Sequence, residues 1–259
     1  MNRAARLVIF GLVSAWVIKA GYLVKLFVGN VGHDVAHPLF PAFFENGWVS
    51  LVAYLLPMLA AVSFCFPLTQ ARVISVASLF AACALTLLLH ANGHNDATYC
   101  TVLWVSLWLL WLGTQWHAPV TQTTRIAIVL GHAIVGMIFL GGFVGKLTPE
   151  YWSGETLYHI FFVQRETVLF SAVRARFEAG DMEQLARGLA RGAVVAEGVL
   201  ACALLIPPRL LCWIGVPLLL GMMAVCSYLL YSVLGGLLFL ILACHSLAKE
   251  NSARPALVA

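Results

Sequence analysis

A lysine that ends a run of small and apolar residues is the most specific chemical feature of the chain. It lies in the string Gly141-Gly142-Phe143-Val144-Gly145-Lys146-Leu147-Thr148-Pro149-Glu150-Tyr151-Trp152-Ser153-Gly154. A lysine that leaves an apolar helix is partly deprived of water, so its ammonium group gives up a proton more readily. Lys146 is therefore a candidate general base. The same string also fits a membrane anchor, with the ammonium group and the aromatic residues at the interface.

Histidines form two pairs with a spacing of four residues, His33 with His37 and His90 with His94. On a helix this spacing brings two imidazole rings to one side, as a transition-metal site requires. Two such pairs at one end of a bundle would supply four ligands. The alternative is that these histidines make surface contacts or hydrogen bonds, and no metal is then needed.

Charged residues inside apolar runs are a further candidate class, because an unpaired charge at membrane depth is costly. Glu197 lies in the run VVAEGV, residues 194–199, and Lys19 lies in the first apolar run. We expect Glu197 to be buried with a polar partner, either Lys19 or another side chain. Such a pair would serve either function or the stability of the fold.

The composition defines the environment in which these residues must work. Of the 259 residues, 62% are hydrophobic and only 10% are charged, whereas soluble domains have about 25% charged residues. Mean hydropathy is +0.93. These values exclude disordered chains and soluble disulfide scaffolds, and a net charge of +4 indicates no nucleic-acid partner. The lipid bilayer is the expected surrounding.

Apolar runs long enough to cross a bilayer occur about eight times. They cover residues 6–28, 47–67, 71–90, 98–116, 125–145, 191–206, 209–228 and 230–248. The sequence therefore predicts an all-α fold, a polytopic integral membrane helical bundle that forms a single transmembrane domain over residues 1–259. Residues 146–191 are rich in charge and predict a water-facing amphipathic insertion between spans 5 and 6. Within it, a short helix is expected at 181–191.

The distribution of basic residues predicts the orientation, because short cytoplasmic loops are enriched in lysine and arginine. With the amino terminus inside, the cytoplasmic side collects Arg3, Arg6, Arg72, Arg125, Arg209, Lys249 and Arg254. We therefore expect both termini to be cytoplasmic in a multi-pass protein, of a bacterial inner membrane if the resemblance described next holds.

The string around Lys146 resembles the vitamin K-dependent gamma-carboxylase-like family, whose stand-alone bacterial members are called horizontally transferred transmembrane domain proteins. The family pattern has Lys-Leu after a small-residue helix end, then Trp and Gly. Lys146-Leu147 and Gly154 fit this pattern, and Trp152 comes one residue late with Tyr151 in its place. Residues 92–95 followed by Tyr99, and the span through Glu197, resemble further family segments.

The resemblance implies a quinol- or oxygen-linked membrane enzyme. In the carboxylase the matching lysine is implicated in deprotonating a reduced quinone, which gives Lys146 the role of base and His94 that of an orienting or proton-relay group. Tyr151, Trp152 and Glu197 are the expected cofactor-binding residues, and Lys146 and His94 are expected at a common cavity. Carboxylation of protein glutamate is not expected, because the sequence lacks the large soluble carboxy-terminal domain of the carboxylase.

The alternative is a non-catalytic membrane subunit or maturation factor, similar in character to the DoxX-like and MauE-like proteins. A short Lys-Leu motif at a helix end also occurs in DoxX-like proteins, so the motif alone does not separate the two functions. A membrane or periplasmic protein would be the partner in that case. Bound quinone favours the enzyme, and stable association with another membrane protein favours the subunit.

Overall fold

The described part of the chain is built from helices. The computed structural model describes residues 1–30, 41–90, 96–163, 175–176, 178–225 and 228–252, and these residues contain no strand. The α-helices are α1 (Asn2–Asn30), α2 (Ala42–Glu45), α3 (Gly47–Leu55), α4 (Gln70–Leu88), α5 (Ala97–Thr114), α6 (Val120–Gly145), α7 (Pro149–Ser153), α8 (Glu155–Tyr158), α10 (Ala179–Ala201), α11 (Pro208–Val225) and α12 (Tyr228–Ser252). Two 3-10 helices, η1 (Leu56–Cys65) and η3 (Ala203–Leu205), and one π-helical turn, η2 (His159–Val163), complete the set. The all-α prediction is confirmed.

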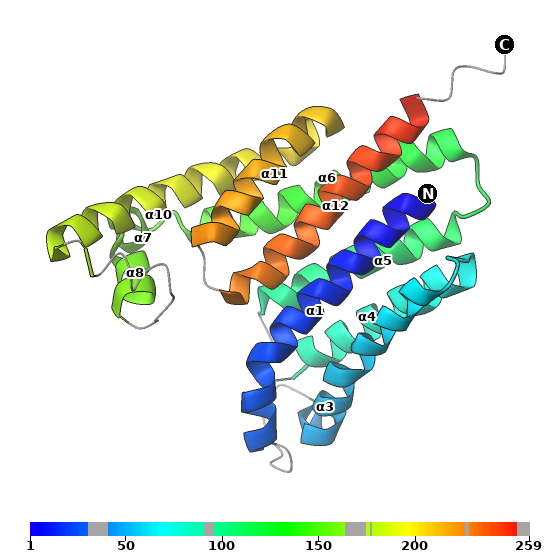
Figure 1. Cartoon of the computed structure of the whole chain (residues 1–259), viewed down its shortest axis with the longest axis horizontal. Coiled ribbons are helices and arrows are strands. Elements are labelled where there is room, and N and C mark those ends of the chain that lie inside the picture. The colour runs from blue at the N-terminus through cyan, green and yellow to red at the C-terminus, as the bar shows by residue number, and fades with distance from the viewer. Residues whose placement is uncertain (31–40, 91–95, 164–174, 177, 226–227, 253–259) are drawn as a thin grey trace. The chain divides into compact units, whose positions relative to one another are not determined.

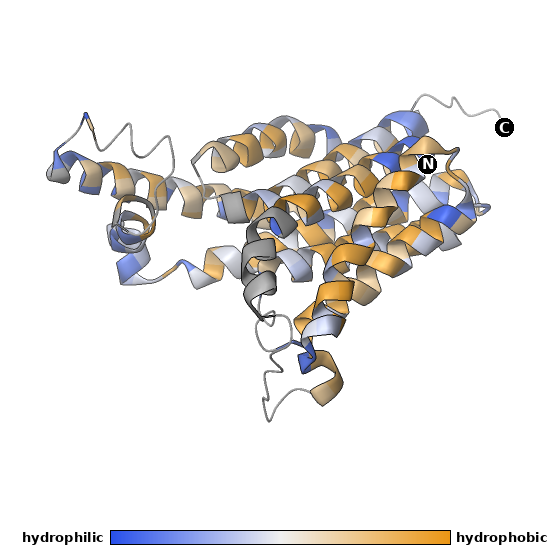
Figure 2. Cartoon of the chain, turned by 60° about the horizontal axis from the view of Figure 1, so that its bottom comes forward, coloured by the Kyte–Doolittle hydropathy of each residue, from blue (hydrophilic) through white to orange (hydrophobic). Residues whose placement is uncertain are grey.

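Five of the described helical segments are long and apolar enough to cross a membrane. They are Gly47–Cys65, Gln70–Leu88, Ala97–Thr114, Val120–Gly145 and Leu230–Ser252, and they match the expected spans 2, 3, 4, 5 and 8. Figure 2 shows hydrophobic colour along much of the long helices, and hydrophilic colour gathers near helix ends. The chain is a multi-pass helical membrane protein. Eight spans stay a prediction, because α11 is shorter and α10 carries charge along its first half.

Side-chain caps fix where several of these helices begin. Asn46, Thr69, Asp96 and Thr148 each accept a hydrogen bond from a backbone N–H in the first turn of the following helix. Such a cap satisfies one of the N–H groups that a helix start leaves unpaired. One of the caps, Thr148, therefore fixes the start of α7, which carries the candidate site residues Tyr151 and Trp152.

The first of two compact units comprises Met1–Ile134 and Pro207–Ala259. Within it α1 packs along α12 and against α5, α4 packs against α5, and α11 packs against α12 (Figure 1). Its core is apolar, with Trp16, Phe80 and Leu109 among its fully buried side chains. The indole of Trp108 is also buried and donates a hydrogen bond to the carbonyl of Ala127, 2.7 Å away.

The second unit comprises Val135–Ile206, so the division falls inside α6. In this unit α7 and α8 lie against the first half of α10 (Figure 1). The short helix expected at 181–191 and the span expected at 191–206 are wrong as separate elements, because α10 runs unbroken from Ala179 to Ala201. The charged residues that suggested a break lie on an amphipathic helix and do not interrupt it. The predicted end of the insertion, residue 191, therefore falls within α10.

Candidate functional site

Lys146 and Glu197 form an ion pair within the second unit. The Nζ atom of Lys146 donates hydrogen bonds to both carboxylate oxygens of Glu197, each 2.8 Å away. Glu197 comes from α10 and is buried, with 6% of its surface exposed. Lys146, directly after α6, keeps 27% of its side chain exposed. The expectation that Glu197 is buried and partnered is confirmed, and the partner is Lys146.

A glycine of α6 makes room for this pair. A Cβ atom at Gly142 would lie 3.0 Å from Oε2 of Glu197, which is tighter than most contacts of real Cβ atoms, so the carboxylate would have to shift by a few tenths of an ångström. The carboxylate therefore approaches the helix backbone directly, as small residues allow between membrane helices. Nζ of Lys146 also lies 3.5 Å from the carbonyl oxygen of Gly142. That carbonyl is in the last turn of α6, where a cation is favoured by the helix dipole.

Tyr151 provides an aromatic wall beside the ammonium group. The centre of its ring lies 5.6 Å from Nζ of Lys146, within the range of a cation–π contact. Tyr151 belongs to the short helix α7, and its side chain is buried. Pro149 stands at the start of that helix, and the Thr148 hydroxyl accepts a hydrogen bond from the Tyr151 N–H at 3.3 Å. The sequence Thr-Pro after Lys146 thus turns the chain so that Tyr151 faces back to the lysine.

The end of α7 packs closely against α10 at Gly154, whose backbone has the left-handed conformation. Gly154 has a φ of 89°, and a Cβ atom there would lie 2.5 Å from the backbone nitrogen of Arg187. Both facts require glycine. Nearby, Nε of Arg187 donates to the carbonyl of Ser153 at 3.2 Å. The guanidinium group of Arg191 lies 5.5 Å from the Trp152 ring, which is 45% exposed.

The geometry of the pair limits the chemistry that each member can perform. While the ammonium group donates to both oxygens, it is a donor, and lone pairs able to accept a further proton remain on the carboxylate. In this arrangement a carboxylate oxygen of Glu197 can accept a proton, and the ammonium group of Lys146 can stabilise a neighbouring anion. The two residues were singled out separately by the sequence, and the structure brings them together with Tyr151.

Lys19 has a different partner from the one expected. Its Nζ atom lies 2.5 Å from Oδ2 of Asp96 and 5.7 Å from the ring centre of Tyr99, all within the first unit. The hydroxyl of Tyr99 lies 3.5 Å from that of Tyr54. Sequence reasoning missed this cluster. The available signal was the position of Asp96 directly before an apolar run, which is typical of a helix cap.

The predicted metal ligands are described only in part. His90 is buried at the end of α4, with Nε2 3.8 Å from Oε2 of the buried Glu45. His33, His37 and His94 lie outside the described residues, so the approach of His94 to Lys146 stays a prediction. Over the described ranges, no three His, Cys, Asp or Glu side chains come close enough to hold a metal ion.

Comparison of the chain with protein-family models, with curated proteins and with solved structures finds no match.

Proposed function

We propose that the chain is an integral membrane enzyme that removes a proton from a lipid-soluble quinol, whose anion is then oxidised to the quinone with oxygen as the electron acceptor. Glu197 is the proton acceptor, and Lys146 is the cation that stabilises the quinol anion. The observation that carries the proposal is the position of Nζ of Lys146, 2.8 Å from both oxygens of a buried carboxylate. A buried carboxylate with a specific charged partner is a candidate functional site. The resemblance of the Lys146 string to the carboxylase-like family supports deprotonation of a quinol at this site, although the resemblance implies that the lysine is the base, whereas we assign the proton to Glu197.

The residue types at this site fit the head group of a quinol. A hydroquinone supplies an acidic hydroxyl, which needs an acceptor for its proton and a cation for the oxygen left behind. Glu197 is the acceptor and Lys146 is the cation. The exposed indole of Trp152 offers a flat face for an aromatic ring.

The chain's own groups account for the proton transfer in two steps. Glu197 first takes the proton on a carboxylate oxygen, so its negative charge disappears. The ammonium group of Lys146, freed from part of that attraction, then stabilises the new anion. The ring of Tyr151, with its centre 5.6 Å from Nζ, favours the charged form of the lysine by a cation–π contact.

The experiment is the extraction of quinone from detergent-purified protein. Wild-type protein is expected to retain quinone, and the double variant Lys146→Met/Glu197→Met is expected to retain at least about tenfold less, because hydrogen bonds to charged groups are lost. Glu150→Gln, an exposed carboxylate in the same segment, is the matched control. Absence of quinone from wild-type protein, together with stable co-purification of another membrane protein, would instead support the non-catalytic subunit.

A further inference from the structure

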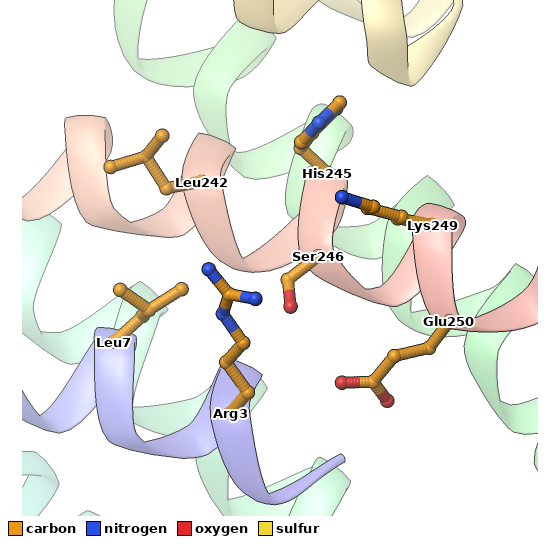
Figure 3. Close-up of a pocket in the computed structure, with 7 residues that line it drawn as sticks. All are labelled: Arg3, Leu7, Leu242, His245, Ser246, Lys249 and Glu250. Atoms are coloured by element: carbon orange, nitrogen blue, oxygen red, sulfur yellow. The ribbon is translucent and has the colours of Figure 1, made fainter.

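Two adjoining cavities lie at the amino-terminal end of α1, within the first unit. One, of about 430 Å³, lies between α1 and α12 (Figure 3). The other, of about 610 Å³, is lined by the first turns of α1 and by Phe64 of η1. Arg3 and Leu7 line both cavities, so the two adjoin at these residues.

Positive charge dominates the polar side of these cavities. Arg3 and Arg6 come from α1 and Lys249 comes from α12, and none of the three makes an ion pair with a described residue. Figure 3 shows the Arg3 guanidinium group reaching from α1 toward the Ser246 hydroxyl on α12. Glu250 also lines the first cavity, and its carboxylate is bound by the amino-terminal ammonium group at 2.7 Å. The net charge is therefore positive.

The rest of the lining is apolar. Leu7 and Leu242 line the first cavity, and Leu7, Phe10 and Phe64 line the second. Phe10 and Phe64 are 49% and 43% exposed, and their ring centres are 6.1 Å apart. Contact between these rings and water is unfavourable, so an apolar acyl chain fits the side of the cavities that Phe10 and Phe64 line.

His245 adds a polar atom without a partner. Its side chain lines the first cavity, and its Nδ1 atom is buried with no hydrogen bond to any described residue. A buried polar atom without a bond is costly, so such an atom at a cavity wall indicates a missing partner.

We propose that the two cavities bind one anionic phospholipid, with its phosphate at Arg3, Arg6 and Lys249 and its acyl chains along Leu7, Phe10 and Phe64. Guanidinium groups bind phosphate in a bidentate manner. In phosphatidylglycerol, the hydroxyl groups of the headgroup would be the hydrogen-bond partners of Ser246 and His245. A zwitterionic lipid lacks the net negative charge that three unpaired cations favour. The three cations are expected on the cytoplasmic side of the membrane, where the leaflet is rich in anionic lipids.

The experiment measures bound lipid by native mass spectrometry after reconstitution into nanodiscs of phosphatidylglycerol and phosphatidylcholine in equal parts. Wild-type protein is expected to retain phosphatidylglycerol through detergent extraction, and Arg3→Gln/Arg6→Gln/Lys249→Gln is expected to retain at least about tenfold less. The double variant Arg125→Gln/Arg209→Gln, which removes two exposed cations outside the cavities, is expected to retain as much as wild type. Equal loss in this control would overturn the proposal.

Two further arms separate a built site from surface charge and from a phosphate site. Leu242→Trp fills part of the first cavity without changing the charge, and it is expected to lose phosphatidylglycerol also. Full retention of phosphatidylglycerol by this variant would show that surface charge alone explains the binding, and it would overturn the proposal. Inorganic phosphate is expected neither to displace the lipid nor to raise the unfolding temperature of delipidated protein, whereas phosphatidylglycerol raises it. Equal stabilisation by inorganic phosphate would identify a phosphate site and also overturn it.

Discussion

The carboxylate of Glu197 lies directly against the backbone of Gly142, where a Cβ atom would be 3.0 Å from Oε2. This close approach lets an acidic residue of α10 reach the lysine that follows α6. A helix with a larger residue at position 142 would hold the carboxylate away from Nζ of Lys146. The packing of two helices and the chemistry of the pair therefore depend on the same glycine.

Gly142→Ala is expected to destabilise the protein by about 1–3 kcal/mol, because the added methyl group displaces a buried and bonded carboxylate. Gly141→Ala is the matched control. A Cβ atom there meets nothing within 4 Å, so this substitution is expected to stabilise α6 by about 0.5–1 kcal/mol. Unfolding midpoints in the same detergent compare the two variants. Equal midpoints would show that Glu197 does not need this contact.

Lys146→Met is expected to lower the free energy of unfolding by about 3–5 kcal/mol, because it leaves the buried Glu197 carboxylate without its partner. Glu197→Met removes the buried charge itself, so adding it to Lys146→Met is expected to recover most of the loss. A double-mutant cycle of reversible unfolding in mixed micelles measures the coupling. A lysine that only anchored the helix at the interface would give additive effects and a small loss.

Gly154→Ala is expected to destabilise the second unit more than an ordinary glycine substitution. It places a side chain at a φ of 89° and at 2.5 Å from the backbone nitrogen of Arg187, so α7 must move away from α10. Gly188→Ala, at an exposed position of α10 with open space around it, is the control. Thermal unfolding is the measurement, and similar midpoints for both variants would contradict the described contact.

Asp96 has two roles that substitution can separate. It accepts a hydrogen bond from the Thr98 N–H at 2.8 Å as the cap of α5, and it pairs with Lys19. Asp96→Asn keeps the cap and loses the charge, whereas Asp96→Ala loses both. The alanine variant is expected to be less stable than the asparagine variant by about 1 kcal/mol. Equal stability of the two variants would show that the cap contributes nothing.

Much of the fold follows from hydrophobic run lengths. The runs at 71–90 and 98–116 correspond to α4 and α5 within a few residues, because an apolar stretch of that length has few alternatives to a membrane helix. The same criterion failed at residue 191. Arg187 and Arg191 suggested a short helix that ends at residue 191, yet they contact Ser153 and Trp152 from the surface of a helix that continues to Ala201.

The site was predictable in its members and not in its pairing. The string around Lys146 and the charge of Glu197 are visible in the sequence, since both are unusual beside apolar residues. Their contact bridges 51 positions and depends on which helices are neighbours, and run lengths do not contain that information. For the same reason Lys19 was considered as the partner of Glu197, whereas it pairs with Asp96.

The most direct test of the proton-accepting pair is the rate of hydroquinone-dependent oxygen uptake by protein in lipid nanodiscs. Glu197→Gln preserves the shape of the side chain and removes the proton acceptor, so we predict a loss of at least about 100-fold relative to wild type, in the range of general acid–base effects. Glu150→Gln is predicted to keep the wild-type rate. A Glu197→Gln protein that folds and oxidises hydroquinone as fast as wild type would contradict the account.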